Sequence, residues 1–308
     1  MGDCMKKIAL ISFMFGKLPE YLPIWLYTCE KNPEVQFFVL TDDTYKGTLP
    51  ANVSIIPTEL EDLRQKISEK VGFDVNLPWG YKLCDYRPAY GIIFEDLLKD
   101  FDFWGHCDMD ILWGNMAHFL TEEKLNNYDR IYSLGALSIY RNTEEVNNWF
   151  RTLDTGPYNN YKYVFTEPDV HWFDEWGPEN SRGTSEIIKY NKKRFFLDFE
   201  CFDINGMKGK FEHALRGADF NKYPNLYVKY DNGCTTVNSG NTEIKEVLYT
   251  HFSKRNIKLP EQIKEPFYLV SPGVITNDFK EALKDHILEN KKYDLMMLKM
   301  RIEKKLKG

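Results

Sequence analysis

Short apolar blocks and longer amphipathic blocks alternate along the first third of the chain. Short runs rich in Ile, Val and Phe predict buried strands, and apolar residues at helical spacing predict helices. The predicted strands span 6–15, 35–43, 53–58 and 101–110, and the predicted helices span 19–32, 60–72 and 87–100. This alternation predicts an α/β fold with a mostly parallel, Rossmann-like central sheet flanked by helices.

Aspartates follow two of the predicted strands. Asp42 and Asp43 end one of them, and Asp108 and Asp110 end the last, in the stretch FWGHCDMDILWGN. Ligand sites form at the carboxyl ends of parallel strands. Two neighbouring carboxylates are costly to bury unless a cation lies between them, and their oxygens suit Mg²⁺ or Mn²⁺. The Asp-x-Asp pair therefore indicates either a metal site that binds a diphosphate or acids at a solvated strand end.

Composition narrows the class of protein. The chain has 308 residues, 43% hydrophobic and 15% aromatic, which is enough for a large packed core. A net charge of −6 argues against a general nucleic-acid binder. Six scattered cysteines without a C-x-x-C pair signal neither a zinc site nor a disulfide framework. Because the chain also has no 18-residue apolar stretch, we expect it to be cytoplasmic.

The turn after the first predicted strand, FMFGKLPEY, holds one glycine. It fits neither of the glycine patterns that bind a dinucleotide or a nucleoside triphosphate. A diphosphate would therefore be held by a cation between the aspartates instead of by a glycine-rich loop.

Three further segments accompany the Asp-x-Asp pair: DYRPAYG (85–91), SLGALSIYRN (133–142) and YTHFSKRNIK (249–258). Their order resembles that of sugar-nucleotide glycosyltransferases of the A fold, most closely family 8, and of uncharacterised transferases of bacterial polysaccharide clusters. The resemblance implies metal-dependent transfer of a hexose from a nucleotide diphosphate sugar, with a UDP-sugar favoured. The acceptor would be a saccharide or a lipid-linked saccharide of a bacterial surface polysaccharide.

The resemblance also implies roles for individual residues. Asp108, Asp110 and His251 would bind Mn²⁺ or Mg²⁺, and Lys254, or Lys258 in its place, would contact the diphosphate. The remaining contacts to the nucleotide-sugar donor would come from Ser12, Phe13, Phe15, Asp42, Lys82, Arg87 and Asp108. Plainer interpretations stay open: Asp42 and Asp43 as turn residues, Arg87 as a capping or ion-pairing residue, and His251 as an ordinary residue at a strand end.

Segment 166–186 concentrates tryptophans and acids between Pro and Gly residues, which predicts a loop. Aromatic faces beside carboxylates suit a sugar, so the loop is either part of the site or an acidic surface loop. Asp174 and Glu175 are the candidate catalytic residues. In an inverting enzyme one of them would accept the proton of the attacking hydroxyl. In a retaining enzyme they would orient the donor or the acceptor. Family 8 implies retention, but the stereochemistry stays open.

The chain is predicted to form one catalytic domain over 1–258, with a nucleotide-sugar half to about 115 and an acceptor half after it. Residues 259–308 would form an extension that ends in a basic amphipathic helix over 290–308. That helix would lie on an anionic membrane surface, pack on the protein, or mediate oligomerisation. Segment 187–235 has no recognisable motif.

Two other classes of function remain open. A metal-dependent phosphoryl or nucleotidyl transferase also uses paired aspartates, although it usually needs more carboxylates or a glycine-rich loop. A non-catalytic carbohydrate-binding protein would explain the aromatic residues but not the metal-like acids.

Overall fold

The computed structural model describes residues 6–157, 160–176, 183–206, 209–215, 219–253 and 255–307. The chain divides into two compact units. Unit 1 consists of Met1–Pro19, Asn32–Met109 and Leu120–Asp198, and unit 2 of Glu20–Lys31, Asp110–Phe119 and Phe199–Gly308. The chain therefore passes between the units several times, instead of changing once near residue 115 as the sequence predicted.

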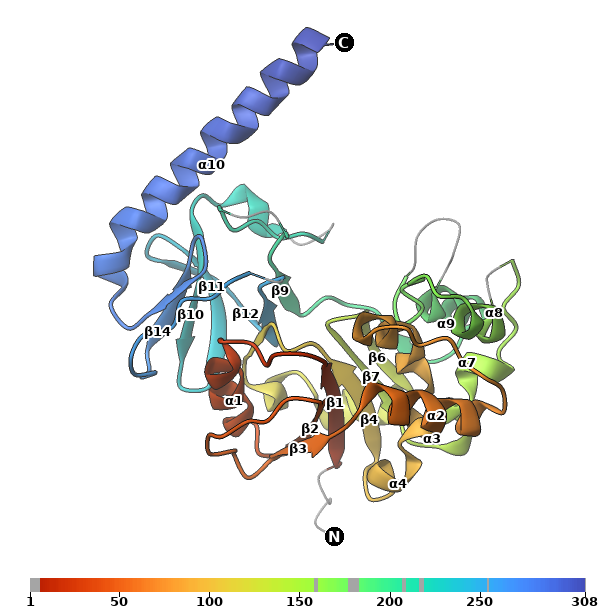
Figure 1. Cartoon of the computed structure of the whole chain (residues 1–308). Coiled ribbons are helices and arrows are strands. Elements are labelled where there is room, and N and C mark those ends of the chain that lie inside the picture. Colours follow the sequence, from red (N-terminus) through yellow and green to blue (C-terminus); the bar gives the residue numbers. More distant parts are fainter. Residues whose placement is uncertain are drawn as a thin grey trace. The chain divides into compact units, whose positions relative to one another are not determined.

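Unit 1 is built around a seven-stranded sheet (Figure 1). In spatial order its strands are β3 (Val53–Pro57), β2 (Val35–Thr41), β1 (Ile8–Met14), β4 (Phe103–Cys107), β7 (Leu137–Arg141), β6 (Arg130–Leu134) and β8 (Phe195–Phe196). The first four strands run parallel, β7 is antiparallel to both of its neighbours, and β8 pairs parallel with β6. The predicted α/β class with a mostly parallel central sheet is thus confirmed.

Helices pack against this sheet. They are α2 (Leu60–Val71), the 3₁₀ segment η1 (Gly80–Ala89), α3 (Tyr90–Ile93), α4 (Glu95–Leu98), α5 (Glu122–Asn127), α6 (Glu144–Asn147), α7 (Trp149–Thr152), α8 (Tyr161–Thr166) and α9 (Thr184–Tyr190). Leu63 and Ile67 of α2 join Ile11 of β1 in one core cluster. Ile8 and Leu10, which alternate with Ile11 along β1, are buried as well. Because β1 is covered on both faces, its sequence reads as a continuous apolar run.

Two predicted helix boundaries had different outcomes. α2 ends where expected, because Gly72 adopts a left-handed φ of 84° that favours glycine. The predicted helix over 87–100 is instead broken into η1, α3 and α4. Pro88 explains part of this break, since it lacks an N–H and disfavours α-helical geometry at Arg87.

Unit 2 contains two smaller sheets and helix α1 (Leu22–Glu30). The three-stranded sheet has the order β5 (Ile111–Trp113), β13 (Tyr249–His251) and β9 (Cys201–Asp203). The five-stranded sheet has the order β12 (Thr242–Val247), β11 (Cys234–Ser239), β10 (Leu226–Asp231), β14 (Phe267–Val270) and β15 (Val274–Thr276). Two 3₁₀ segments, η2 (Met116–His118) and η3 (Asp219–Lys222), also belong to this unit. Ile24 of α1 and Leu112 of β5 share its core with Phe252.

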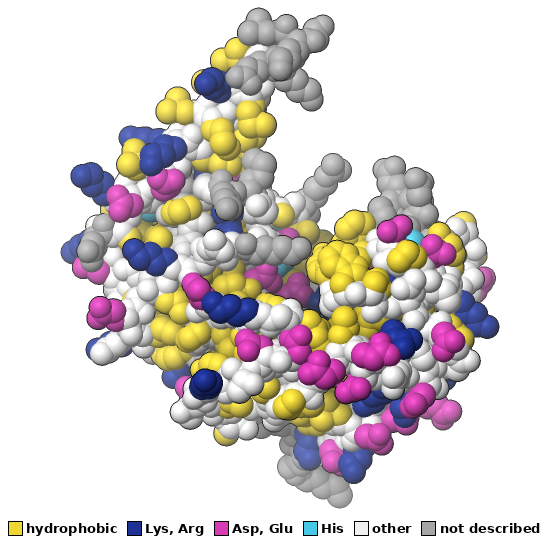
Figure 2. Space-filling model, viewed as in Figure 1, with side chains coloured by type: hydrophobic (Ala, Val, Ile, Leu, Met, Phe, Trp, Pro, Cys, Tyr) yellow, Lys and Arg dark blue, Asp and Glu magenta, His cyan; other side chains and the backbone are white. Residues whose placement is uncertain are grey.

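The carboxyl-terminal region differs from the predicted extension. Residues 259–276 contribute β14 and β15 to the five-stranded sheet, so the predicted boundary at 258 is wrong. Helix α10 (Phe279–Lys307) begins eleven residues before the predicted start at 290. Large apolar side chains are exposed along it (Figure 2), namely Leu283, Leu288, Leu295, Met296, Leu298, Met300 and Ile302. In the part of the chain that the structure describes, no helix has the length and apolar character to cross a membrane.

Candidate functional site

The aspartates after β2 hold the loop that follows β1. Asp42 Oδ1 accepts a hydrogen bond from Gly16 N at 2.7 Å, and Asp43 Oδ2 accepts one from Leu18 N at 2.9 Å. The backbone hydrogen bonds from Leu18 and Thr44 lower the pKa of Asp43. Gly16 has a φ of 85°, which glycine adopts without strain. Both acids therefore act as loop-fixing residues, which matches the plainer interpretation of this pair.

The three residues predicted to frame the base lie in or just after β1. Ser12 is 2% exposed and its hydroxyl donates to Cys107 O at 2.7 Å, which links β1 to β4. With this burial Ser12 has no surface for a nucleotide, so that prediction is corrected. Phe13 and Phe15 are half-buried and pack on the core, with the Phe13 ring edge-on to Tyr90 at 5.2 Å. Their contact with a nucleotide stays a prediction.

Lys82 also has a structural position. Its side chain is fully buried, and its ammonium group donates to Asp85 Oδ2 at 2.8 Å and to Val164 O at 2.9 Å. A third bond goes to Asp169 O at 2.5 Å. All three protons are thus used within the protein, as a buried ammonium requires. The prediction that Lys82 contacts the donor is corrected for this reason.

Arg87, in η1, connects the acid that follows β4 to an acid of the 166–186 segment. Its guanidinium donates to Asp108 Oδ1 at 2.5 Å, to Asp174 Oδ2 at 2.8 Å and to Gly135 O at 2.9 Å. These two carboxylates raise the pKa of the guanidinium, although burial opposes them. The planar fork of arginine suits such multiple contacts. Arg87 therefore fixes the orientation of both acids within unit 1.

Asp174 is the most perturbed acid of this group. It is 1% exposed, and burial raises its pKa to about 7 even though Arg87 acts in the opposite direction. Among the described residues its second oxygen, Oδ1, has no hydrogen-bond partner. Its neighbour Glu175 accepts a bond from Gly135 N at 3.1 Å. A carboxyl group with a pKa near neutrality can exchange a proton at physiological pH.

Gly135 is a residue that the sequence analysis named only as part of a segment. It lies in the turn between β6 and β7 and bonds to Arg87 through its oxygen and to Glu175 through its nitrogen. An added Cβ would lie 3.2 Å from Asp174 Oδ2 and 3.4 Å from Arg87 Nη1. The glycine of SLGALSIYRN is thus explained by the close approach of these side chains.

Unit 2 contains the other predicted ligands. His251 ends β13, and Asp110 immediately precedes β5, the antiparallel neighbour of β13. His251 Nε2 lies 3.3 Å from Asp110 Oδ1. On the other side of the ring, Nδ1 lies 2.8 Å from Oδ1 of Asp203 in β9. Asp203 was missed because its segment, 187–235, carries no motif. The predicted ligand Asp108 belongs to unit 1 and is joined to Asp110 through Met109.

The remaining predicted residues have mixed outcomes. Segment 166–186 begins at the end of α8 and reaches into α9. In it, Trp172 is 41% exposed, whereas the Trp176 indole donates to Ser133 Oγ at 3.1 Å. Lys254 lies outside the described residues. Its alternative, Lys258, bonds through its backbone to Gly273 O at 2.9 Å and has an exposed side chain.

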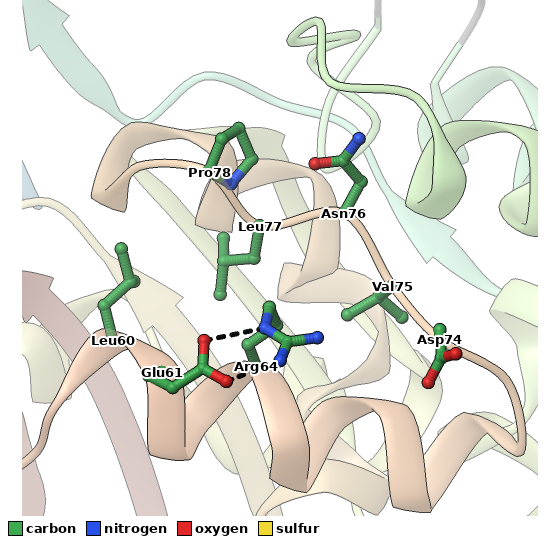
Figure 3. A pocket seen from close by; sticks show the side chains of 8 residues that line it. All are labelled: Leu60, Glu61, Arg64, Asp74, Val75, Asn76, Leu77 and Pro78. Atoms are coloured by element: carbon green, nitrogen blue, oxygen red, sulfur yellow. Dashed lines mark hydrogen bonds and ion pairs between the residues drawn. The ribbon is translucent and has the colours of Figure 1, made fainter.

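Unit 1 also has a surface pocket between α2 and segment 74–78 (Figure 3). Arg64 lies in it and forms an ion pair with Glu61 at 2.5 Å. Asn76 and Leu77 line the other side. None of the predicted site residues lines this pocket, and the Arg64 charge is already paired there, so we assign it no role.

Comparison with known proteins places the chain in a family without assigning a function to it. No curated protein matches the sequence. Residues 10–279 match the sequence model of DUF6625, described as a family of unknown function. This match covers most of the 308 residues, and the chain therefore belongs to the DUF6625 family.

Proposed function

We propose that this protein is a metal-dependent glycosyltransferase of the A fold that transfers a hexose from a nucleotide diphosphate sugar. The observation that carries the proposal is the position of His251 between two carboxylates of unit 2. Its Nε2 faces Asp110 Oδ1 at 3.3 Å, and its Nδ1 is held by Asp203 Oδ1 at 2.8 Å. Metal-binding histidines characteristically donate the N–H of their other ring nitrogen to a carboxylate in this way.

The chemistry of the side chains fits a divalent cation. Asp110 and His251 offer an oxygen and a nitrogen, and Asp108, two residues before Asp110, offers a further carboxylate. Oxygen ligands with one imidazole suit Mn²⁺ and tolerate Mg²⁺. Bound there, the cation would compensate the negative charge of the leaving diphosphate.

The residues of unit 1 have supporting roles in this proposal. Arg87 holds Asp108 from one oxygen, which orients the carboxylate. Asp174, whose pKa burial raises to about 7, is the candidate proton acceptor for the attacking hydroxyl if the reaction inverts configuration. In a retaining reaction Asp174 and Glu175 would orient the donor or the acceptor. The acceptor we propose is a saccharide or a lipid-linked saccharide.

A panel of nucleotide sugars tests the activity. The full chain is incubated with UDP-, GDP- and CMP-sugars and Mn²⁺, and free nucleotide is measured. We expect selective release from one sugar nucleotide, with UDP favoured, and loss of that activity in excess EDTA. Full activity in EDTA would refute the metal dependence. Cleavage of a UDP- or GDP-sugar to a nucleoside monophosphate and a sugar 1-phosphate, without release of the nucleoside diphosphate, would instead favour the phosphoryl or nucleotidyl transferase.

Point variants test the assignment of the ligands. Asp110→Asn and Asp108→Asn should reduce turnover by at least about 100-fold. The thermal midpoint should stay close to that of the wild type, since asparagine keeps the size of the side chain and neither acid belongs to the hydrophobic core clusters. His251→Ala should weaken Mn²⁺-dependent donor binding, and Asp203→Asn should weaken it by about 10-fold. Asp100→Asn, at an exposed aspartate before β4, is the matched control. Unchanged donor affinity in His251→Ala would return this histidine to a structural role.

We also propose that α10 attaches the protein to the surface of an anionic membrane. Leu295, Leu298 and Ile302 of this helix are 50–67% exposed. Segment 290–308 contains seven Lys or Arg residues against two acids, in a chain with a net charge of −6. A basic helix with exposed apolar side chains is attracted to anionic lipid and inserts those side chains at the interface. Such a position would suit a lipid-linked acceptor.

A further inference from the structure

Three side chains with nitrogen, sulfur and oxygen donors meet in unit 2. His118 ends η2, Cys234 begins β11, and Glu246 lies in β12. Their ligand atoms all lie within 4.8 Å of one another. His118 Nδ1 is 2.8 Å from Glu246 Oε1. None of the three takes part in the proposed glycosyl transfer.

The sheet brings two of these side chains to the same face. β11 and β12 are antiparallel, and Thr236 pairs with Glu246. Residues directly opposite each other in a sheet point to the same side, and so do residues two apart in one strand. Cys234, two residues before Thr236, therefore lies on the side of Glu246.

Two hydrogen bonds fix the segment that carries His118, the third of these side chains. Gly114 N donates to Leu248 O at 2.7 Å, and Thr235 Oγ1 donates to Trp113 O at 3.1 Å. A Cβ at Gly114 would come within 2.5 Å of Val247 O, so this close approach requires glycine. These contacts fix the start of the segment that carries His118 against β11 and β12.

We infer that His118, Cys234 and Glu246 form a zinc site. Zinc takes histidine nitrogen, cysteine sulfur and carboxylate oxygen, and three protein ligands leave a fourth position for water. The site is accessible, because the side chains of His118 and Glu246 are 51% and 34% exposed and Cys234 is half-buried.

The sulfur distinguishes this group from Asp110 and His251. A thiolate ligand selects zinc over Mn²⁺ and Mg²⁺, which prefer oxygen. Cys29, Cys84, Cys107 and Cys201 are buried, whereas Cys234 is half-buried. Zinc here would link η2 to β11 and β12 and stabilise unit 2, with release of the thiol proton to water.

Cobalt substitution tests the inference, because Co²⁺ bound to a thiolate gives a charge-transfer absorption band that oxygen and nitrogen ligands do not give. The full chain is titrated with Co²⁺ under reducing conditions. We expect the band to saturate at one equivalent, to disappear when one equivalent of Zn²⁺ is added, and to be absent in Cys234→Ser. Glu246→Gln, which keeps the shape of the side chain, should weaken Zn²⁺ binding at least 10-fold.

Matched variants make the result specific. Glu243→Gln, at an exposed position of the same strand, should leave Zn²⁺ affinity unchanged. Asp110→Asn should also keep the band, which separates this site from the proposed catalytic metal. Thermal denaturation checks that each variant is folded. No band in the wild type, or a band that survives in folded Cys234→Ser, would overturn the zinc site and leave an ordinary His118–Glu246 ion pair.

Discussion

At the scale of single residues, burial decides which polar groups can act on a ligand. Lys82 is fully buried, and its ammonium group donates all three hydrogen bonds to groups of the protein, so it stabilises the segment around Asp169. Asp174 is buried to a similar degree, but its Oδ1 has no hydrogen-bond partner among the described residues. A buried carboxylate that is only partly satisfied is costly to ionise. The free-energy cost of ionising Asp174 should therefore appear in the pH dependence of the stability of the protein.

Burial raises the pKa of Asp174 from an ordinary value of 3.8 to about 7. The folded state therefore favours the protonated form. The stability that this group contributes is fully present below about pH 4 and is lost as the pH rises through about 7. We expect Asp174→Asn, which cannot ionise, to gain thermal stability relative to the wild type as the pH increases from 5 to 8. Thermal midpoints of both proteins, measured across this range, check the prediction.

Asp100→Asn is the control for this pH series, because Asp100 is exposed and should follow the wild type at each pH. A difference between Asp174→Asn and the wild type that stays constant from pH 5 to 8 would show that Asp174 is ionised throughout this range. In that case its ion pair with Arg87 would outweigh the effect of burial.

At the scale of secondary-structure elements, the turn between β6 and β7 organises unit 1 around Arg87. The oxygen of Gly135 accepts from Arg87, and its nitrogen donates to Glu175, so one residue contacts side chains of two other segments. Both bonds are made by the backbone of Gly135, and both depend on its close approach to the two side chains. A short turn thus positions a cation and an acid at the edge of the sheet.

Gly135→Ala should disturb this arrangement. The new methyl group would lie 3.2 Å from Asp174 Oδ2, closer than an ordinary contact, and 3.4 Å from Arg87 Nη1, at the lower limit of one. We expect a destabilisation of about 1–3 kcal/mol, typical of overpacking, and a loss of turnover of similar free energy. Thermal denaturation and nucleotide release measure the two effects. Gly206→Ala, where nothing lies within 4 Å of the new methyl group, should change neither.

Helix α10 combines a packed beginning with an exposed end. Tyr293 is 5% exposed, and Asp294 forms an ion pair with Lys210 at 3.1 Å. Leu295, the next residue, is 67% exposed. Truncation after Asp294 should therefore remove the proposed membrane-binding part and keep the contacts of the helix with the rest of unit 2.

The full chain should pellet with vesicles of phosphatidylglycerol and phosphatidylcholine at low salt, and the truncated chain should stay in solution. Vesicles of phosphatidylcholine alone are the control for charge. Equal pelleting of both chains would contradict membrane binding by α10. If the full chain instead forms a dimer by size-exclusion chromatography and the truncated chain does not, α10 mediates self-association.

At the scale of the whole molecule, neither unit is a continuous piece of chain. Unit 2 consists of Glu20–Lys31 and Asp110–Phe119, both from the first half of the sequence, together with Phe199–Gly308. Strand β13 is central in its sheet, between β5 and β9, and β5 comes from the second of these early segments. The core of unit 2 therefore depends on residues far apart in sequence.

A fragment of residues 199–308 should not fold alone. It lacks Ile24 of α1 and Leu112 of β5, which belong to the core of unit 2, and β13 would lose one neighbour. Loss of two buried aliphatic side chains and of a paired strand costs several kcal/mol, comparable to the stability of a small domain. We expect no cooperative thermal transition by circular dichroism, with the full chain as the control. A cooperative transition in the fragment would show that α1 and β5 are dispensable.

The sequence by itself determined the local features of this protein. Apolar runs predicted β1, β2, β3 and β4 to within three residues, and Gly72 correctly ended α2. It also placed Asp108 directly after a strand. These features depend on side-chain period and backbone preference, which act over a few neighbouring residues. The α/β class follows from the order of such elements alone.

Only the tertiary structure decided which polar residues are buried and which meet. Ser12 and Lys82 lie on elements that the sequence placed near a site, but packing encloses them. Asp203 reaches His251 through sheet pairing, and Cys234 meets His118 with no motif spacing between them. Such contacts join residues dozens of positions apart, and their geometry is set by the packing of the whole unit. No local pattern encodes that packing, because a side chain's burial and partners are properties of the folded chain.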